Sequence, residues 1–427
     1  MPQRKYSKTR TQVAKPSKRI ILPIGLKQYN HMLNDSAAFR KWLDQMIAQY
    51  PELFPADIKA GYRLHDLLPT SVKLPAVQLR RIRLYQDDAA GQAQVFTIAP
   101  SEVLPYMTGS TDEVEKALFL RRFGVPFWGL TYVFGRDDSY WERLSRSFGS
   151  YAIVGTTLKD PHKLPEHLLV DEKHVHFNGQ TAYIATTVAQ DCLFGASLAL
   201  NADEAALAEA YGYFKQEAQT LAPDYAPQTV NTDGWRATQK AWQALFVTVI
   251  IIDCFLHAFL KIRDRCKGLK TLFPQIKAYV WQVYHTHDAV DFRQQMTEFQ
   301  AWAQRAVTGT ALEAIEKLVA KTDRFVLAFD YPQAYRTSNM IDRLIEPMAR
   351  WLFSARAFHG HWRSAELQVR AWALCHNFWP YCPRARATQH YLSPAHKLNG
   401  FVYHPNWLHN LLISTSSTGM KVNHRKC

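Results

Sequence analysis

Residues 161–268 alternate between short apolar runs, typical of strands, and segments with the hydrophobic period of amphipathic helices. Three strand-like runs come first, and Asn178-Gly179, between the first two, is a strong hairpin signal. The predicted strands are Glu166–Val170, Thr181–Val188, Cys192–Leu200, Thr229–Asn231 and Val247–Ile252, and the predicted helices are Asp203–Leu221, Trp235–Phe246 and Cys254–Arg265. This order predicts an α/β domain in which an antiparallel meander precedes crossover strands.

The chain before residue 160 has a different pattern. It predicts a strand pair over Gln78–Tyr85 and Ala93–Ile98, followed by short helices over Glu113–Phe123, Pro126–Phe134 and Ser139–Phe148. Three short helices with tight glycine or aspartate junctions are typical of a helix-turn-helix, here near residues 111–149. The third helix, which carries Arg143 and Arg146, would then be the recognition helix, although helical triplets also occur in proteins that bind no DNA.

Helical periodicity dominates residues 269–330, with no proline after Pro274. This predicts a helical insertion, at 269–333, rather than part of the sheet. A further helix is expected to begin near Thr337-Ser338-Asn339, and the tail after Ser414 is polar.

Composition narrows the class of protein. The chain has 427 residues, enough for two or three domains, and its 13% aromatic content argues against disorder. The longest apolar run, near Val247–Leu256, is interrupted by Asp253 and is too short to span a bilayer. No secretory signal is evident, and six scattered cysteines do not form a disulfide framework, so we expect a cytoplasmic protein.

The charge is concentrated at the two ends of the chain. The net charge is +14, yet residues 20–330 carry 32 basic and 34 acidic side chains. Met1–Arg19 holds seven basic residues and no acid, and Tyr331–Cys427 holds twelve basic residues and three acids. Cationic ends on a near-neutral body favour a polyanionic partner, nucleic acid, over an anionic membrane, because no lipid-binding amphipathic helix accompanies them.

The strand order is the layout of a ribonuclease-H-like fold, whose active site holds two divalent cations between carboxylates from two strand ends and a late helix. The sequence supplies acids in that order: Asp171 after the first strand, Asp233 after the fourth and Asp342 inside the helix near Asn339. Carboxylates suit Mg²⁺ because it is a hard, oxygen-seeking cation. An isolated aspartate after a strand is more often a turn former or a helix cap, and it is the ordered set that suggests a metal site.

Four further acids compete for these roles: Glu172, Asp191, Asp253 and Glu346. Glu346 is the principal rival of Asp342 for the third ligand, since residues four apart share a helix face. Pro347 is expected to kink that helix, which could move Glu346 toward the metals or away from them.

Several motifs together resemble the transposases of bacterial insertion sequences, closest to the group related to the Mutator-like families. They are Leu-Val-Asp171 with its hairpin, Asn-Thr-Asp233-Gly-Trp, Cys254-Phe-Leu-His257, the helical insertion and Thr337-Ser338-Asn339-Met-Ile-Asp342. The resemblance covers roughly residues 165–380 and implies an Asp–Asp–Glu-type triad, here Asp171, Asp233 and Asp342, binding two Mg²⁺ or Mn²⁺ ions. Aspartate rather than glutamate at position 342 departs from the family pattern and leaves Glu346 open.

Two features beside the triad have alternative interpretations. Cys254 and His257 could be half of a zinc site, with Cys375, His376 or Cys382 as partners, or packing residues, or His257 could orient an active-site aspartate or the scissile phosphate. Arg336, Arg343 and Arg350 recur every seven residues, which predicts a one-sided stripe that either tracks DNA phosphates or is simply solvated.

The sequence therefore predicts a bacterial, nucleoid-associated DNA transposase that acts as a dimer or larger assembly on the ends of its element. The alternatives are a metal-dependent nuclease of the same fold without strand transfer, and a catalytically inactive DNA-binding protein derived from a transposase. The predicted segments are a disordered basic arm (1–19), a DNA-binding region (20–160), the first catalytic part (161–268), the insertion (269–333), the last catalytic helix with basic helices (334–413) and a flexible tail (414–427).

Overall fold

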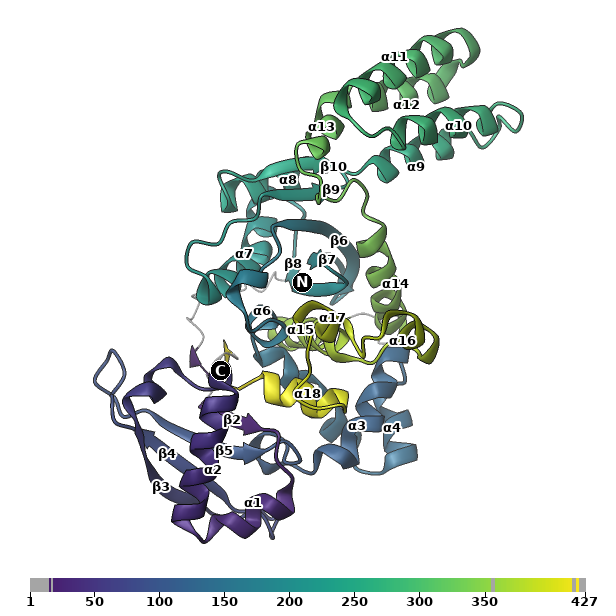
Figure 1. The fold of residues 1–427 in the computed structure, drawn as a ribbon. Helices are drawn as coiled ribbons and strands as arrows, with labels where there is room; N and C mark the ends of the chain where they lie inside the picture. The colour runs from purple at the N-terminus through teal and green to yellow at the C-terminus, as the bar shows by residue number, and fades with distance from the viewer. Residues whose placement is uncertain (1–14, 17, 355–357, 417–419, 422–427) are drawn as a thin grey trace, which may run out of the picture. The chain divides into compact units, whose positions relative to one another are not determined.

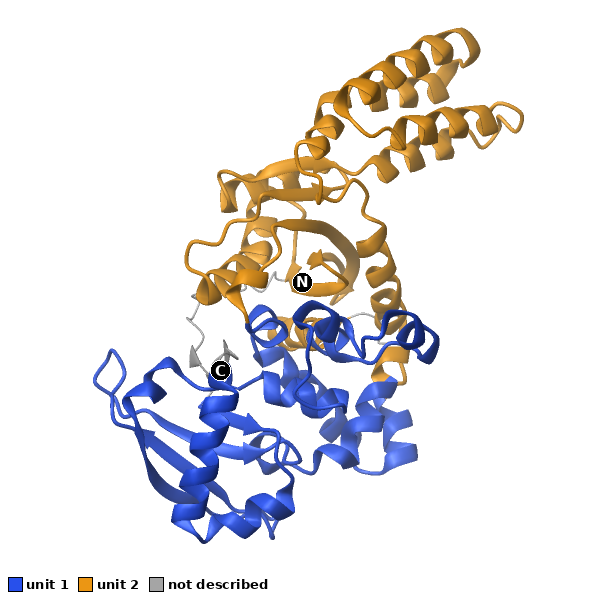
Figure 2. Cartoon of the chain, viewed as in Figure 1, with its two compact units in different colours: residues 1–120, 127–159, 374–427 blue, residues 121–126, 160–373 orange. Residues whose placement is uncertain are grey.

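The computed structural model describes residues 15–16, 18–354, 358–416 and 420–421. The chain is a mixed α/β protein that divides into two compact units (Figure 2). Unit 1 comprises residues 1–120, 127–159 and 374–427, and unit 2 comprises residues 121–126 and 160–373. The segment predicted at 334–413 is therefore shared between the two units. Most of the predicted arm at 1–19 lies outside the described residues.

Unit 1 contains a four-stranded mixed sheet. β2 is parallel to β5, and β5, β4 and β3 are antiparallel neighbours in the order β2-β5-β4-β3. The strands are β2 (Arg19–Leu22), β3 (Tyr62–Leu68), β4 (Leu79–Leu84) and β5 (Val95–Pro100), and helices α1 (Leu26–Leu33) and α2 (Ser36–Gln49) accompany them. The predicted strand pair corresponds to β4 and β5. β2 and β3 were not predicted, because β2 has only four residues and β3 contains a bulge that breaks its alternation.

The other helices of unit 1 are short. The three helices predicted near residues 111–149 are confirmed as helices, which are α3 (Thr111–Leu120), α4 (Phe127–Phe134) and α5 (Asp138–Ser147). Asp137 caps α5 by accepting the Tyr140 N–H at 2.7 Å. The remaining helices of this unit are α6 (Ile153–Thr157), α16 (Pro383–Gln389), α17 (Pro394–Asn399) and α18 (Trp407–Ser414).

Unit 2 is built on a five-stranded mixed sheet in the order β10-β9-β6-β7-β8 (Figure 1). β9 and β10 run parallel to β6, whereas β7 and β8 form the antiparallel meander that the sequence predicts. The elements are β6 (His167–Phe177), β7 (Gln180–Ala189), β8 (Cys192–Ala199), α7 (Glu204–Leu221), β9 (Thr229–Thr232), α8 (Arg236–Leu245) and β10 (Ile250–Asp253).

Two strand boundaries differ from the prediction. β6 does not end at Val170 but continues to Phe177, because Asp171 pairs with Thr186 of β7 and the ladder extends beyond it. β10 begins at Ile250 rather than Val247, whose side chain is 89% exposed. The apolar run that predicted this strand therefore includes part of an exposed turn.

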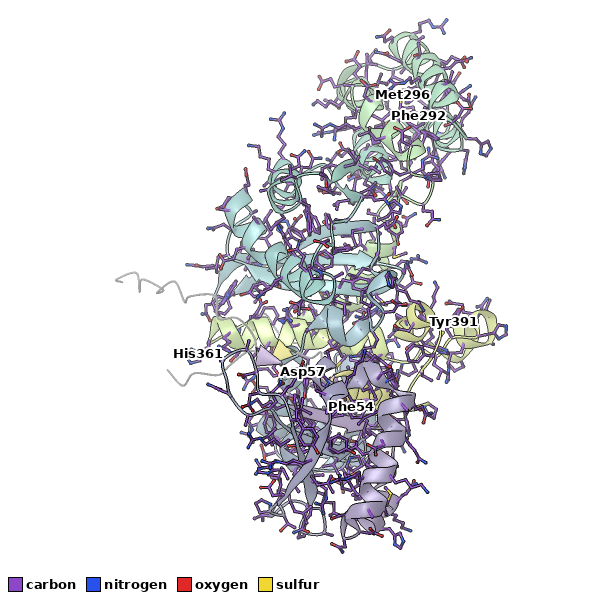
Figure 3. The ribbon with its side chains drawn as sticks, turned by 60° about the vertical axis from the view of Figure 1, so that its left-hand side comes forward. Phe54, Asp57, Phe292, Met296, His361 and Tyr391 are labelled. Carbon is purple, nitrogen blue, oxygen red and sulfur yellow. The ribbon has the colours of Figure 1, made fainter. Side chains whose placement is uncertain are left out.

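A helical bundle follows the sheet and has its own core. It contains α9 (Phe255–Arg265), α10 (Phe273–Tyr284), α11 (Ala289–Ala306), α12 (Gly309–Val319) and α13 (Thr322–Val326). Phe292 and Met296, labelled in Figure 3, are buried in that core together with Phe255 and Phe259 of α9. The bundle thus begins at α9, before the predicted start of the insertion.

The chain returns from the bundle to the sheet and continues as α14 (Asn339–Ser354) and α15 (Trp362–Phe378). α14 contacts β6 and is helical across Pro347. Within the described residues, no helix is long and apolar enough to cross a membrane.

Candidate active site

Asp171 and Asp233 lie at neighbouring strands of the five-stranded sheet. Asp171 is in the middle of β6, and Asp233 follows the end of β9, which is parallel to β6. The carboxylate of Asp171 accepts the Glu172 N–H at 2.8 Å, and that of Asp233 accepts the Trp235 N–H at 2.8 Å. Gly234 lies between Asp233 and α8. Its φ of +92° is a conformation that suits glycine, and it turns the chain sharply after Asp233.

The three predicted aspartates lie near enough to one another for the charges of Asp233 and Asp342 to act on Asp171. Burial raises the pKa of Asp171 to about 6, and the nearby carboxylates of Asp233 and Asp342 act in the same direction, against the Glu172 N–H and His257. Residues 171, 233 and 342 are far apart in sequence, so it is the fold that brings these like charges together.

Ser338 connects Asp342 to the Cys254–His257 pair. The Ser338 hydroxyl oxygen lies 3.3 Å from Asp342 Oδ2, 3.2 Å from His257 Nδ1 and 3.3 Å from Cys254 Sγ. The hydrogen bond with Cys254 raises the pKa of His257 to about 9 despite burial, and Asp342 and Asp171 add to this effect. The His257 imidazole is therefore positively charged at neutral pH, and the Ser338 hydroxyl lies between it and Asp342.

The structure distinguishes Asp342 from Glu346. The Glu346 side chain is 73% exposed and lies 3.7 Å from Arg350, whereas Asp342 interacts with Asp171. The competitor Asp253 is 1% exposed and forms ion pairs with Lys321 at 2.6 Å and Arg324 at 3.5 Å. Its charge is already compensated, so Asp253 attaches α13 to the end of β10.

Glu172 is a buried carboxyl that the sequence named only as a competitor. Because adjacent residues of a strand point to opposite faces, its side chain leaves β6 on the other side from Asp171. Glu172 Oε1 accepts hydrogen bonds from the Tyr211 hydroxyl at 2.7 Å and the Thr238 hydroxyl at 2.6 Å. Burial raises the pKa of Glu172 to about 7 in spite of these bonds. Glu172 therefore joins β6 to α7 and α8 behind the aspartates.

Glu172 is expected to make stability depend on pH. Its folded-state pKa of about 7 exceeds the ordinary 4.5, so the folded protein binds more protons between these values. The free energy of unfolding should therefore fall as pH rises from 4.5 to 7, by up to about 3 kcal/mol.

Glu172→Gln keeps both hydrogen bonds without the charge and should remove most of this decline in urea unfolding at pH 5 and pH 8. Glu166→Gln, an exposed carboxyl next to β6, is the matched control and should behave as the parent. Equal pH dependence in the parent and Glu172→Gln would contradict the assignment.

The donor set of the three aspartates suits a hard divalent cation. A bound cation would stabilise the charged form of Asp171, whose pKa is raised by burial and by the charges of Asp233 and Asp342. Across the residues that the structure describes, however, no three His, Cys, Asp or Glu side chains are arranged to hold one metal ion. The same holds for the zinc site considered at Cys254 and His257, where Ser338 occupies the space beside the thiol.

The predicted arginine stripe is wrong for Arg336. This residue precedes α14, and its guanidinium lies over the rings of Tyr284 at 4.9 Å and Phe329 at 4.6 Å, so it anchors the base of the bundle. Arg343 and Arg350 are exposed on α14, where Arg350 faces Glu346.

On α5, the side chain of Arg143 is 63% exposed and lies 4.0 Å from Asp137, and Arg146 pairs with Glu142 at 2.9 Å. Asp138, Glu142, Arg143 and Arg146 give α5 no net charge.

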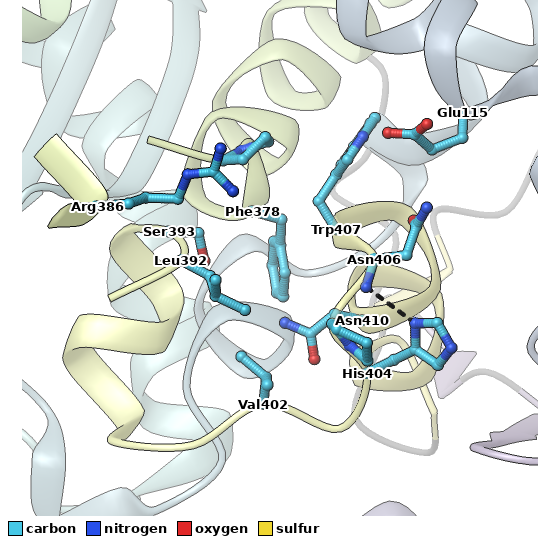
Figure 4. A pocket seen from close by; sticks show the side chains of 12 residues that line it. Glu115, Phe378, Arg386, Leu392, Ser393, Val402, His404, Asn406, Trp407 and Asn410 are labelled. Atoms are coloured by element: carbon cyan, nitrogen blue, oxygen red, sulfur yellow. Dashed lines mark hydrogen bonds between the residues drawn. The ribbon is translucent and has the colours of Figure 1, made fainter. Parts of the chain in front are cut away.

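Unit 1 contains a separate pocket of about 180 Å³ beside α18 (Figure 4). Its polar side chains already serve the local fold: Asn406 caps α18, the His404 ring accepts the Asn406 N–H at 3.0 Å, and Asn410 accepts the Tyr403 N–H at 3.0 Å. We assign no chemistry to this pocket.

Neither a protein-family model nor a curated protein matches this sequence.

Proposed function

We propose that the protein is a DNA transposase of an insertion sequence that cleaves the phosphodiester at each element end and joins the freed 3′-hydroxyl to target DNA. The observation that carries this proposal is the position of Asp171 on β6 and of Asp233 after the adjacent parallel strand β9, with Asp342 of α14 linked through Ser338 to His257. A ribonuclease-H-like assignment of unit 2 is part of the proposal, supported by the strand order β10-β9-β6-β7-β8.

The three aspartates are the residues that would hold divalent cations in this proposal. A bound pair of Mg²⁺ or Mn²⁺ ions would activate a water or a 3′-hydroxyl for attack on phosphorus. The Ser338 hydroxyl, which also contacts His257, holds the Asp342 carboxylate in place from one side. Glu172 holds the strand that carries Asp171 from the other. Side chains that are already held in position would stabilise the transition state of phosphodiester cleavage without having to rearrange during the reaction.

The proposed partner is the DNA at both ends of the element. At least two copies of the chain would be needed to bring these ends together. The basic termini of the sequence support a polyanionic partner. The predicted helix-turn-helix remains a candidate for recognition of the terminal repeats, with Arg143 as its exposed arginine.

Cleavage and joining of element-end DNA by the full chain test the proposal. A duplex carrying the inverted repeat that flanks the gene should be nicked in Mg²⁺, and its 3′-end should join to a plasmid, with both products absent in EDTA. Nicking without joining would indicate the nuclease alternative. Specific binding without metal-dependent nicking would indicate the inactive DNA-binding alternative, and either result contradicts a transposase.

Glu346→Gln is expected to leave cleavage within about twofold of the parent rate. The carboxylate is exposed and faces Arg350 rather than the aspartates, so removal of its charge leaves the site intact. Initial rates of nicking at saturating Mg²⁺ measure this. A loss comparable to that of a triad substitution would show that Glu346, and not Asp342, is the third ligand.

A further inference from the structure

The start of the helical bundle carries a strong local excess of positive charge. Residues 261–277, from the second half of α9 into α10, contain six basic side chains and one acid, Asp264. All six basic residues are exposed, and we call them the α9–α10 basic surface: Lys261, Arg263, Arg265, Lys267, Lys270 and Lys277.

The basic surface is confined to one part of the bundle. Residues 278–330, which complete it, contain five basic and seven acidic side chains. Asp264, the single acid among the six, is shared between Arg263 at 3.4 Å and Lys267 at 3.8 Å, so most of the positive charge is uncompensated. Such a field attracts a polyanion.

The helix α9 connects this surface to the candidate active site. His257, in its first turn, lies 3.2 Å from the Ser338 hydroxyl oxygen, which lies 3.3 Å from the Asp342 carboxylate. Lys261 and Arg265 follow at four-residue intervals, so they lie on about the same helix face, roughly 6 and 12 Å farther along the axis. Positive side chains therefore continue along α9 from the point where a scissile phosphate would meet the aspartates.

We propose that the α9–α10 basic surface binds the phosphate backbone of the DNA duplex that extends from the active site, an inference that rests on the proposed function. The contact would be independent of sequence, because lysine and arginine side chains that neutralise phosphates fix the position of DNA without identifying its bases.

The chemistry of the surface favours nucleic acid over an anionic membrane. Peripheral helices bind lipid by inserting an apolar face, but the apolar side chains of α9 and α10 are used in the bundle core. Phe255, Phe259, Ile262 and Ile276 are each at most 7% exposed. Charge without an available apolar face suits a phosphate backbone.

The salt dependence of DNA binding by the full chain tests the inference. The probe is a random-sequence duplex, titrated without divalent cations over a range of NaCl concentrations. The double variant Lys261→Gln/Arg265→Gln should reduce the slope of log K against log[NaCl] by roughly 2, which corresponds to roughly 60-fold weaker binding at about 0.1 M NaCl.

The matched control is Arg305→Gln/Lys317→Gln, which removes the same two charges from exposed positions on α11 and α12. Its slope should equal that of the parent, and both variants should keep the parent melting temperature because the side chains are exposed. Equal slopes for the two variants would overturn the inference. The inference would also be overturned if Lys261→Gln/Arg265→Gln lost binding to phosphatidylserine-containing vesicles but bound DNA as the parent does.

This measurement involves no cleavage, so the two proposals can fail separately. Unchanged DNA binding in the α9 variant of a chain that still cleaves and joins DNA contradicts only the basic surface. Altered binding in a chain that never cleaves supports the surface and contradicts the transposase.

Discussion

Asp171→Asn is expected to lower Mg²⁺-dependent cleavage at least about 10³-fold, with Asp233→Asn and Asp342→Asn losing about as much. Each substitution removes a negative charge from the converging carboxylates but preserves side-chain size. Divalent cations bound by these carboxylates would contribute several kcal/mol of transition-state stabilisation, and about 4 kcal/mol corresponds to this rate factor. Single-turnover nicking rates of the parent and the three variants measure the loss.

Two further results distinguish the loss of a metal ligand from general damage to the fold. The triad variants should bind element-end DNA as the parent does in EDTA, since that measurement requires no cation. His257→Ala, which removes an orienting side chain and not a ligand, should lose only about 10- to 100-fold. Cleavage by Asp171→Asn at the parent rate would reject the assignment of this site.

Arg370→Met is expected to destabilise the protein by about 3–5 kcal/mol. Arg370 of α15 and Glu217 of α7 form a hydrogen-bonded ion pair in which both side chains are 6% exposed. Removal of the guanidinium takes away the positive charge that acts on the buried Glu217 and Glu366 carboxyls, which costs much more than the net contribution of the pair. Urea unfolding of the parent and the variant at pH 7 measures the difference.

The double variant Glu217→Leu/Arg370→Met should regain part of that stability, because it removes the Glu217 charge together with its partner and leaves only the buried Glu366 carboxyl without Arg370. Arg293→Met is the matched control on the surface: Arg293 also pairs with an acid, Asp323, but both side chains are at least half exposed. The control should change stability by no more than about 1 kcal/mol. A similarly small effect for Arg370→Met would contradict the role assigned to the buried pair.

Several elements could be predicted because their signals are local. The Asn178-Gly179 turn joins β6 to β7 as predicted, and α7 covers the predicted helix Asp203–Leu221 except for its first residue, which is the cap. The errors fall where neighbouring segments override the local pattern. β6 continues past Asp171 because the partner strand β7 is long enough to pair with it. Arg336 has the heptad spacing of a surface stripe, but it enters a cluster of aromatic rings.

The sequence by itself determined the order of strands and helices in unit 2, since hydrophobic period and turn residues act over a few positions. It also narrowed the candidate site to a few acids that follow or lie near the ends of these elements. Only the tertiary structure decided between them. Asp342 contacts Ser338, which also contacts His257, whereas Glu346 faces Arg350 and Asp253 is compensated by Lys321. The physical reason is that the charge state and direction of a carboxylate depend on neighbours that are distant in sequence. A hydrophobic period extends over only a few positions and carries no information about such neighbours.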